Sequence, residues 1–108
     1  GVSNTIRGAV ANWSKTLANE IGQFGITVNN VLPGFTETQR LEQIIINKSE
    51  KQKSSVKEVA DQMKQSVPMK RFGYADEVAD AIVYLSLKSS GYINGINLPV
   101  DGGRTGNL

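Results

Sequence analysis

The chain has 108 residues, of which 39% are hydrophobic and 20% are charged, and its formal net charge is +2. This length fits one small domain, and the composition is typical of an ordinary globular protein rather than a disordered one. Cysteine and histidine are both absent, which excludes disulfides, thiolate metal sites and a Ser-His-Asp hydrolase built from this chain alone.

Membrane and nucleic-acid partners are not expected either. No apolar run approaches the roughly 20 residues that cross a bilayer, and no segment is typical of a signal peptide. The lysines of the middle are interleaved with Glu50, Glu58 and Asp61, whereas a nucleic-acid surface usually has a denser basic stripe with aromatic platforms. We therefore expect a cytoplasmic protein with a solvated lysine face and no metal site.

The first predicted element is a helix from Ser3 to Gly22. Its apolar residues recur at steps of three and four and form one stripe: Ile6, Ala9, Val10, Trp13, Leu17 and Ile21. We expect Trp13 to pack in the core or against another helix rather than to bind a ligand. Gly22 is expected to end the helix in the left-handed conformation.

A strand is predicted next, because Gly25 to Leu32 is short and β-branched and stops at Pro33-Gly34. A helix, a short loop and a strand form half of a βαβ crossover, the unit of a parallel sheet.

The polar stretch from Phe35 to Pro68 predicts two helices separated around Ser49 to Ser55. Ser55 and Glu58 fit a capping box, and Pro68 limits the second helix. The first helix has a short apolar face at Leu41, Ile44 and Ile45, and the second has Val56, Val59, Ala60, Met63 and Val67.

A further amphipathic helix is predicted from Ala75 to Leu87, with Asp76 and Glu77 in its first turn, where the helix dipole favours acidic residues. Its expected buried face consists of Val78, Ala81, Ile82 and Leu85.

The segment Ile96 to Val100 predicts a last strand, which Pro99 assigns to a sheet edge because proline has no N–H to donate. Two strands alone are marginal, so the chain is typical of the end of a larger α/β fold.

Six different short motifs follow one another along the chain: Gly25-Ile26-Thr27-Val28-Asn29, Pro33-Gly34-Phe35-Thr36-Glu37-Thr38, Val67-Pro68-Met69-Lys70-Arg71-Phe72-Gly73, Glu77-Val78-Ala79, Tyr92-Ile93-Asn94-Gly95 and Val100-Asp101-Gly102-Gly103. Together with Lys15 to Glu20 in the preceding helix, they resemble the short-chain dehydrogenase/reductase family, in particular 3-oxoacyl-acyl-carrier-protein reductases. The resemblance covers essentially the whole chain.

This resemblance implies an α/β chain that is the C-terminal portion of a Rossmann-like doubly wound parallel sheet, incomplete on its own. Within one domain spanning 1–108, it assigns 1–24 to the active-site helix, 25–34 to a strand and Pro-Gly turn, and 35–68 to a substrate lid. It assigns 75–88 to a helix and 95–103 to the last strand and turn. The lid is expected to be loosely packed, as a moving element would be.

The family binds NAD or NADP, with the pyrophosphate held at a glycine-rich turn and a helix N-terminus. No such turn occurs in this sequence, so we expect the isolated fragment to be inactive.

The family's catalytic Tyr-x-x-x-Lys pair corresponds to Ser3 and Arg7. A serine hydroxyl is a far poorer acid than a phenol of pKa about 10, and arginine is a planar fork rather than a compact ammonium. Ser3 alternatively begins the helix.

The resemblance also implies cofactor-binding roles for Arg7, Pro33, Gly34, Thr36 and Thr38. Pro33 would pack near the nicotinamide, while the Thr36 backbone and the Thr38 amide and hydroxyl would meet the carboxamide. Thr38 is also a candidate helix N-cap, and the two roles are compatible.

The implied function is that of an oxidoreductase in the full-length protein, which transfers hydride between NAD(P)(H) and a carbonyl or alcohol substrate. The alternative is a non-catalytic relative that serves as a binding or assembly module, because Ser3 and Arg7 replace the catalytic pair. The expected partners are a small-molecule substrate and either a complementary N-terminal portion or further copies in a dimer or tetramer. The first helix and the edge strand near Leu98 are the expected interfaces.

Overall fold

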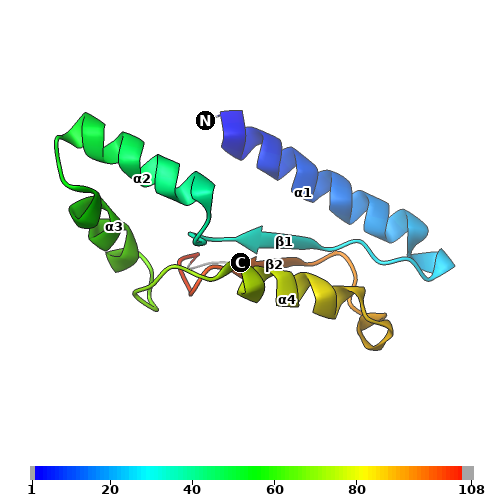
Figure 1. The fold of residues 1–108 in the computed structure, drawn as a ribbon. Helices are drawn as coiled ribbons and strands as arrows, with labels where there is room; N and C mark the ends of the chain where they lie inside the picture. The colour runs from blue at the N-terminus through cyan, green and yellow to red at the C-terminus, as the bar shows by residue number, and fades with distance from the viewer. Residues whose placement is uncertain (1, 106–108) are drawn as a thin grey trace. The chain divides into compact units, whose positions relative to one another are not determined.

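The computed structural model describes residues 2–105, and the side chains of residues 2–4 and of Arg7 lie outside that description. The elements in chain order are α1 (Val2–Ile21), η1 (Gly22–Phe24), β1 (Asn30–Pro33), α2 (Gln39–Gln52), α3 (Val56–Gln65), α4 (Ala75–Ser86), η2 (Lys88–Ser90) and β2 (Asn97–Val100). Figure 1 shows this succession of a long helix, a strand, two helices, a further helix and a last strand. The order is the one predicted from the sequence.

The strands β1 and β2 form a two-stranded parallel sheet. The Asn30 N–H donates to the Ile96 carbonyl at 2.9 Å, and the Gly34 N–H donates to the Val100 carbonyl at 3.0 Å. Both partners advance by four residues in the same direction, which is the register of a parallel ladder. The predicted α/β class is therefore confirmed.

The start of the predicted first strand is not part of the regular ladder: the Gly95 N–H donates to the Val28 carbonyl at 2.9 Å, and asparagine side chains make the other contacts there. The Val28 N–H donates to Asn94 Oδ1 at 2.9 Å. The Asn29 side chain donates to the Ile93 carbonyl at 3.1 Å and accepts from the Ile96 N–H at 3.1 Å. Regular pairing then begins at Asn30.

The left-handed residue after α1 is Gly25 rather than the predicted Gly22. The helix continues into the 3₁₀ turn η1, and Gly25, with φ of 76°, donates its N–H to the Gly22 carbonyl at 3.0 Å. Short 3₁₀ turns are common at helix C-termini, and this one moves the stop by three residues.

The chain divides into two compact units, and β1, α4 and β2 each pass from one to the other. Unit 1 contains residues 1–32 and 80–98, and unit 2 contains residues 33–79 and 99–108.

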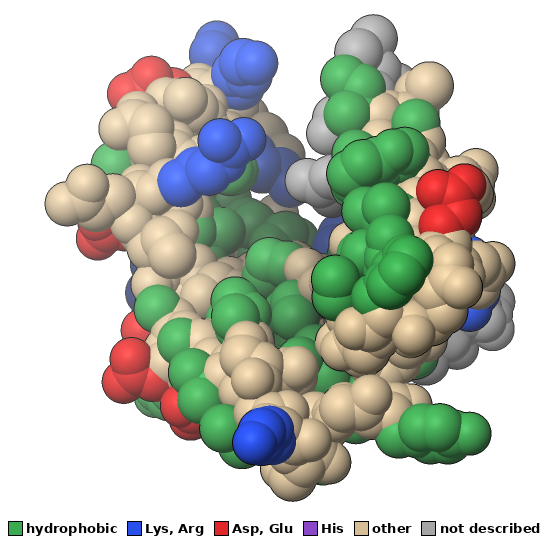
Figure 2. All heavy atoms as spheres, turned by 90° about the vertical axis from the view of Figure 1, so that its right-hand side faces the viewer, with side chains coloured by type: hydrophobic (Ala, Val, Ile, Leu, Met, Phe, Trp, Pro, Cys, Tyr) green, Lys and Arg blue, Asp and Glu red, His purple; other side chains and the backbone are tan. Residues whose placement is uncertain are grey.

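In unit 1, polar contacts join α1 to the start of β1 and to the loop before β2. Ser14 and Ala18 are buried. The Ser14 Oγ donates to Asn30 Oδ1 at 3.2 Å, and the Asn94 amide donates to the Ala18 carbonyl at 3.1 Å. By contrast, Trp13 is 63% exposed, and Figure 2 shows hydrophobic side chains along the surface of this helix. Within the residues that the structure describes, the predicted core packing of Trp13 is therefore wrong, and its contact with a helix of a partner chain stays a prediction.

The predicted buried face of α4 is also only partly buried. Ile82 is 50% exposed, while Val78, Ala81 and Leu85 are half-buried. The amphipathic period of this helix predicts its apolar side correctly, but the described residues leave much of that side uncovered.

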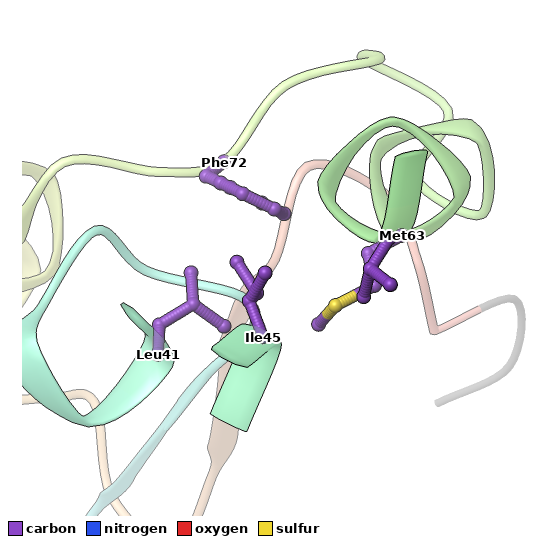
Figure 3. Close-up of a cluster of buried hydrophobic side chains, with 5 residues drawn as sticks. Leu41, Ile45, Met63 and Phe72 are labelled. Atoms are coloured by element: carbon purple, nitrogen blue, oxygen red, sulfur yellow. The ribbon is translucent and has the colours of Figure 1, made fainter. Parts of the chain in front are cut away.

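Unit 2 contains a compact apolar cluster between α2, α3 and the segment before α4. Figure 3 shows Leu41, Ile45, Met63 and Phe72 pointing toward one another, and Val59 is fully buried with them. Burying one such side chain contributes roughly 1.5–3 kcal/mol relative to leaving it exposed. The expectation of a loosely packed 35–68 segment is therefore wrong, because its two helices share a core.

Both predicted helix starts in this segment are confirmed. The Thr38 hydroxyl accepts from the Leu41 N–H at 3.2 Å at the start of α2, and the Ser55 hydroxyl accepts from the Glu58 N–H at 3.1 Å at the start of α3. Each side chain satisfies a backbone donor that the first turn of a helix leaves unpaired.

Candidate functional site

The loop of residues 33–38 follows the carboxyl end of β1, where ligands bind in open α/β sheets. Its first residue, Pro33, ends the strand and is exposed. Gly34 lies so close to the turn after β2 that an added Cβ would be 2.6 Å from the Asp101 Cβ. Glycine is therefore needed at this position for the close approach of two backbone segments, rather than for a left-handed φ.

Thr36 forms an isolated parallel bridge with Gly73. The Gly73 N–H donates to the Phe35 carbonyl, and the Glu37 N–H donates to the Gly73 carbonyl, both at 2.8 Å. In this pattern the residue between the two bonds directs its own N–H and carbonyl to the opposite side. Among residues 2–105, no backbone partner is found for these two groups of Thr36. The Thr36 side chain folds back instead, with Oγ1 donating to the Gly34 carbonyl at 3.0 Å.

Thr38 combines its capping role with an exposed position. Its hydroxyl oxygen accepts from the Leu41 N–H, and a hydroxyl that accepts still has its own proton to donate. The residue lies at the rim of a hollow of about 460 Å³ within unit 2, whose lining includes Glu37, Lys64 and Phe72. Lys64 lies over the Phe72 ring, with its Nζ 5.2 Å from the ring centroid.

The loop offers both donors and an acceptor to a ligand. The backbone of Thr36 offers one N–H donor and one carbonyl acceptor, and the hydroxyl of Thr38 offers a further donor. A planar primary amide presents the matching set, an NH₂ group and a carbonyl. A carboxamide is therefore one of the groups that this set of two donors and one acceptor can bind.

A second hollow in unit 2, of about 340 Å³, is lined by Phe35 of the loop together with Gly73 and the turn after β2. Its lining includes an ion pair in which the two nitrogens of the Arg71 fork meet the two oxygens of Glu77 at 2.7 and 2.9 Å. The hydrogen bond from Arg71 and then that from the Tyr74 N–H lower the pKa of Glu77 to about 2. The Arg104 guanidinium lies 4.2 Å from the centre of the Phe35 ring.

Asp101, in the turn after β2, is the other carboxylate beside this loop. Its oxygens accept from the N–H groups of Gly103 and Thr105, both at 3.0 Å. Hydrogen bonding by the Thr105 side chain, followed by these backbone N–H groups, holds the pKa of Asp101 below its ordinary value. The carboxylate thereby fixes the turn that packs on Gly34.

The two predicted catalytic positions stay predictions. Ser3 and Arg7 are both on the backbone of α1, but their side chains lie outside the described residues. The absence of a metal site also stays a prediction. Among the described residues, no group of three or more acidic side chains is arranged to hold a metal ion. No described helix is long and apolar enough to cross a membrane, and the cytoplasmic location stays a prediction.

Sequence reasoning named Arg71 and Asp101 only within motifs, and it gave Glu77 no role beyond its favourable place in the first turn of a helix. Arg71 and Glu77 lie on either side of Gly73 in the sequence, and this arrangement is the signal that could have suggested an ion pair across that glycine. The pairing of Gly73 with Thr36 has no such local signal, because the two residues are 37 positions apart in the sequence.

Comparison with known proteins gives consistent results. The model of a family described as enoyl-(acyl carrier protein) reductase matches residues 1–105. The 3-oxoacyl-acyl-carrier-protein reductase FabG of Buchnera aphidicola is 38% identical over 97 residues, which cover 90% of this chain and 35% of that protein. The NADPH-dependent reductase BacG of Bacillus subtilis is 33% identical over 101 residues, which cover 94% of this chain and 39% of that protein.

Among solved structures, a short chain dehydrogenase family protein from Francisella tularensis superposes with a TM-score of 0.88 at 29% identity. The match covers 93% of this chain and 41% of that chain. The chain therefore spans between about a third and two fifths of the length of the relatives that it matches.

Proposed function

The chain belongs to the short-chain dehydrogenase/reductase family, and we propose that it is the C-terminal part of an NAD(P)-dependent oxidoreductase that receives the nicotinamide end of the cofactor. The substrate would be a carbonyl compound or the corresponding alcohol. The observation that carries this proposal is the outward-facing N–H and carbonyl of Thr36 beside the exposed hydroxyl of Thr38.

The cofactor, when bound, supplies or accepts the hydride, and the residues of this chain bind and orient it. The Thr36 backbone would pair with the carboxamide, and the Thr38 hydroxyl would donate to the carboxamide oxygen. Pro33 would present an apolar ring edge, because proline has no N–H to be satisfied. The hydrogen bond between the Gly34 N–H and the Val100 carbonyl would hold this loop at the carboxyl ends of the two strands.

Arg7 would hydrogen-bond the nicotinamide ribose, since its fork carries several donors that can reach neighbouring hydroxyls. Ser3 occupies the family's proton-donor position, but a serine hydroxyl is too weak an acid for efficient general acid catalysis. We therefore expect the proton to come from another donor or turnover to be slow. BacG, a relative of this chain, is named as NADPH-dependent.

The test is cofactor binding and hydride transfer by the intact protein. Titration calorimetry should detect NADH or NADPH binding, and Arg7→Ala should weaken it. A ketone panel should then show oxidation of the reduced cofactor. The isolated 108 residues should not bind at micromolar cofactor, because they lack a glycine-rich phosphate turn. Tight binding by this piece alone would contradict the division of roles proposed here.

The second candidate function, a non-catalytic binding or assembly module, is favoured by the presence of Ser3 and Arg7 at the two catalytic positions. The double variant Ser3→Tyr with Arg7→Lys distinguishes the candidates. If the rest of the site is competent, it should raise ketone reduction about 10²–10⁴-fold, the usual contribution of general acid-base catalysis. An intact protein that binds cofactor but is not activated by this change would favour the module.

The proposed partners are a complementary N-terminal portion or further copies in a dimer or tetramer. In unit 1, α1 exposes 57% of Ile6, 48% of Val10 and 63% of Trp13. Exposed apolar patches of several hundred Å² commonly mark interaction surfaces. Analytical ultracentrifugation of the isolated chain should therefore show self-association, and Trp13→Glu should reduce it.

A further inference from the structure

The bridge between Thr36 and Gly73 sets the direction of the two backbone groups that the proposed function assigns to the carboxamide. Both of its hydrogen bonds are made by Gly73, one to Phe35 and one to Glu37, at 2.8 Å each. Any shift of Gly73 would therefore rotate the peptide groups on both sides of Thr36. What holds Gly73 in place then decides how well the loop is ordered.

Steric packing does not hold Gly73. A Cβ added there would meet only the Phe35 carbonyl oxygen at 3.9 Å and Glu77 Oε1 at 4.0 Å, which are ordinary contact distances. Its φ also lies outside the left-handed region that favours glycine. The residue is therefore neither trapped in a tight space nor fixed by a special backbone conformation.

Polar contacts frame Gly73 on both sides instead. Before it, Arg71 Nη1 donates to the Phe72 carbonyl at 3.0 Å. After it, the Tyr74 N–H donates to Glu77 Oε1 at 2.9 Å. The Arg71 fork joins these two contacts by its bidentate pair with Glu77. The two peptide groups adjoining Gly73 are thus tied to one ion pair.

We propose that Arg71 and Glu77 are positioning residues for cofactor binding: their ion pair holds Gly73, and Gly73 orients the peptide groups of Thr36 that receive the carboxamide. This inference rests on the proposed function. The bidentate geometry matters because a planar fork fixes direction as well as charge. In this proposal both side chains act through the backbone rather than by contact with the cofactor.

An ordinary surface ion pair is the competing explanation, since the two side chains are 40% and 41% exposed. Such pairs contribute little to global stability. The two explanations differ in where the effect of a substitution appears. A surface pair affects all ligands equally through stability, whereas a positioning pair affects only the nicotinamide end of the cofactor.

The experiment measures the affinity of the intact protein for NAD(P)H and for the matching ADP-ribose, which lacks the nicotinamide ring. The variants are Arg71→Gln, Glu77→Gln and Arg71→Lys, which keeps the charge but loses the fork. Asp76→Asn is the matched control, because it removes an acidic charge from the neighbouring position in the same first turn of α4.

We expect Arg71→Gln and Glu77→Gln each to raise the NAD(P)H dissociation constant about tenfold or more, because small misplacements of a contact are costly. ADP-ribose affinity should be unchanged, and Asp76→Asn should behave as wild type. Arg71→Lys should not restore nicotinamide affinity. Equal weakening of both ligands, no change in either, or full rescue by lysine would overturn the proposal.

Amide hydrogen exchange separates a failure of this inference from a failure of the proposed function. The amides of Glu37 and Gly73 should exchange faster in Arg71→Gln than in Asp76→Asn, with or without cofactor. If the wild type binds neither ligand, the proposed function is wrong. Faster exchange at these two amides would then still support the coupling, and unchanged exchange would refute it.

Discussion

The two units of the chain are stabilised by different kinds of contact. Unit 2 buries aliphatic and aromatic side chains of α2, α3 and the segment before α4 against one another. Unit 1 relies on the amides of Asn29, Asn30 and Asn94, which join α1, the start of β1 and the loop before β2. Directional hydrogen bonds fix a geometry but bury little apolar area, so unit 1 is left with exposed apolar surface.

This difference separates the two segments to which the resemblance assigns functional roles. The segment that the resemblance assigns to the substrate lid packs its two helices with Phe72 into one apolar core. The helix that the resemblance assigns to the active site exposes much of its apolar stripe in the described part of the chain, which is the surface proposed above for association. The predictions below test each side of this comparison.

The largest effect is expected from the unit 2 core. Ile45→Ala removes a side chain that is 6% exposed and should lower the free energy of unfolding by about 2–5 kcal/mol. The neighbouring Ile44, 43% exposed, is the matched control, and Ile44→Ala should cost less than about 1 kcal/mol. Urea unfolding measures both, and equal losses would contradict the assignment of the core.

The next effect concerns Gly34, where two backbone segments approach closely. Gly34→Ala should cost about 1–3 kcal/mol, because its Cβ would overlap Asp101 and force a shift. Gly73→Ala, in the same bridged region, has space for its methyl group and should be nearly neutral. Thermal unfolding compares the two variants. If Gly73→Ala were the more damaging, the steric argument would be wrong.

A comparable or smaller effect is expected in unit 1 from Asn94. Its side chain satisfies both the Val28 N–H and the Ala18 carbonyl, so Asn94→Ala should cost about 1–3 kcal/mol through unpaired backbone groups. Asn19→Ala, at an exposed position of α1, is the control and should be within about 0.5 kcal/mol of wild type. Denaturant unfolding of both variants would decide whether amides hold this unit.

The smallest effect is a pH dependence from Glu77. Its pKa is lowered in the folded chain from the ordinary 4.5 to about 2, so its contribution to stability is fully present above about pH 4.5. That contribution should be lost as the pH falls from about 4.5 through 2. Glu77→Gln should remove this part of the acid sensitivity while Asp76→Asn retains it. Unfolding midpoints across this range measure the difference, and identical profiles would contradict it.

Much of the fold could be predicted from the sequence because the relevant signals are local. The helical periods and the β-branched run before Pro33 gave the correct order of elements, and the caps at Thr38 and Ser55 depend on residues only three positions away. Burial was predicted less well. A stripe such as the one containing Trp13 shows which side of a helix is apolar, but not what covers it.

The hydrogen bonds at the start of β1 and the backbone bridge at the candidate site could not be predicted, because they join distant residues through neutral or backbone groups. The amide of Asn94 and the N–H of Val28 are 66 positions apart, and nothing in a single asparagine indicates such a partner. The bridge between Thr36 and Gly73 likewise depends on the path of the backbone. The roles of Ser3 and Arg7 stay predictions.

The amide of Asn94 has a chemical consequence beyond folding, because Gly95 follows it. In an Asn-Gly sequence the glycine nitrogen readily attacks the asparagine side chain, and hydrolysis of the resulting ring gives aspartate or isoaspartate. In the folded chain the Gly95 N–H is engaged with the Val28 carbonyl at 2.9 Å, and the Asn94 amide donates to Ala18. We therefore expect the Asn94 side chain to deamidate more slowly in the folded chain than in the unfolded chain. Because a carboxylate cannot donate to the Ala18 carbonyl, deamidated chains should refold poorly, and peptide mapping of aged unfolded samples should find the modification at this position.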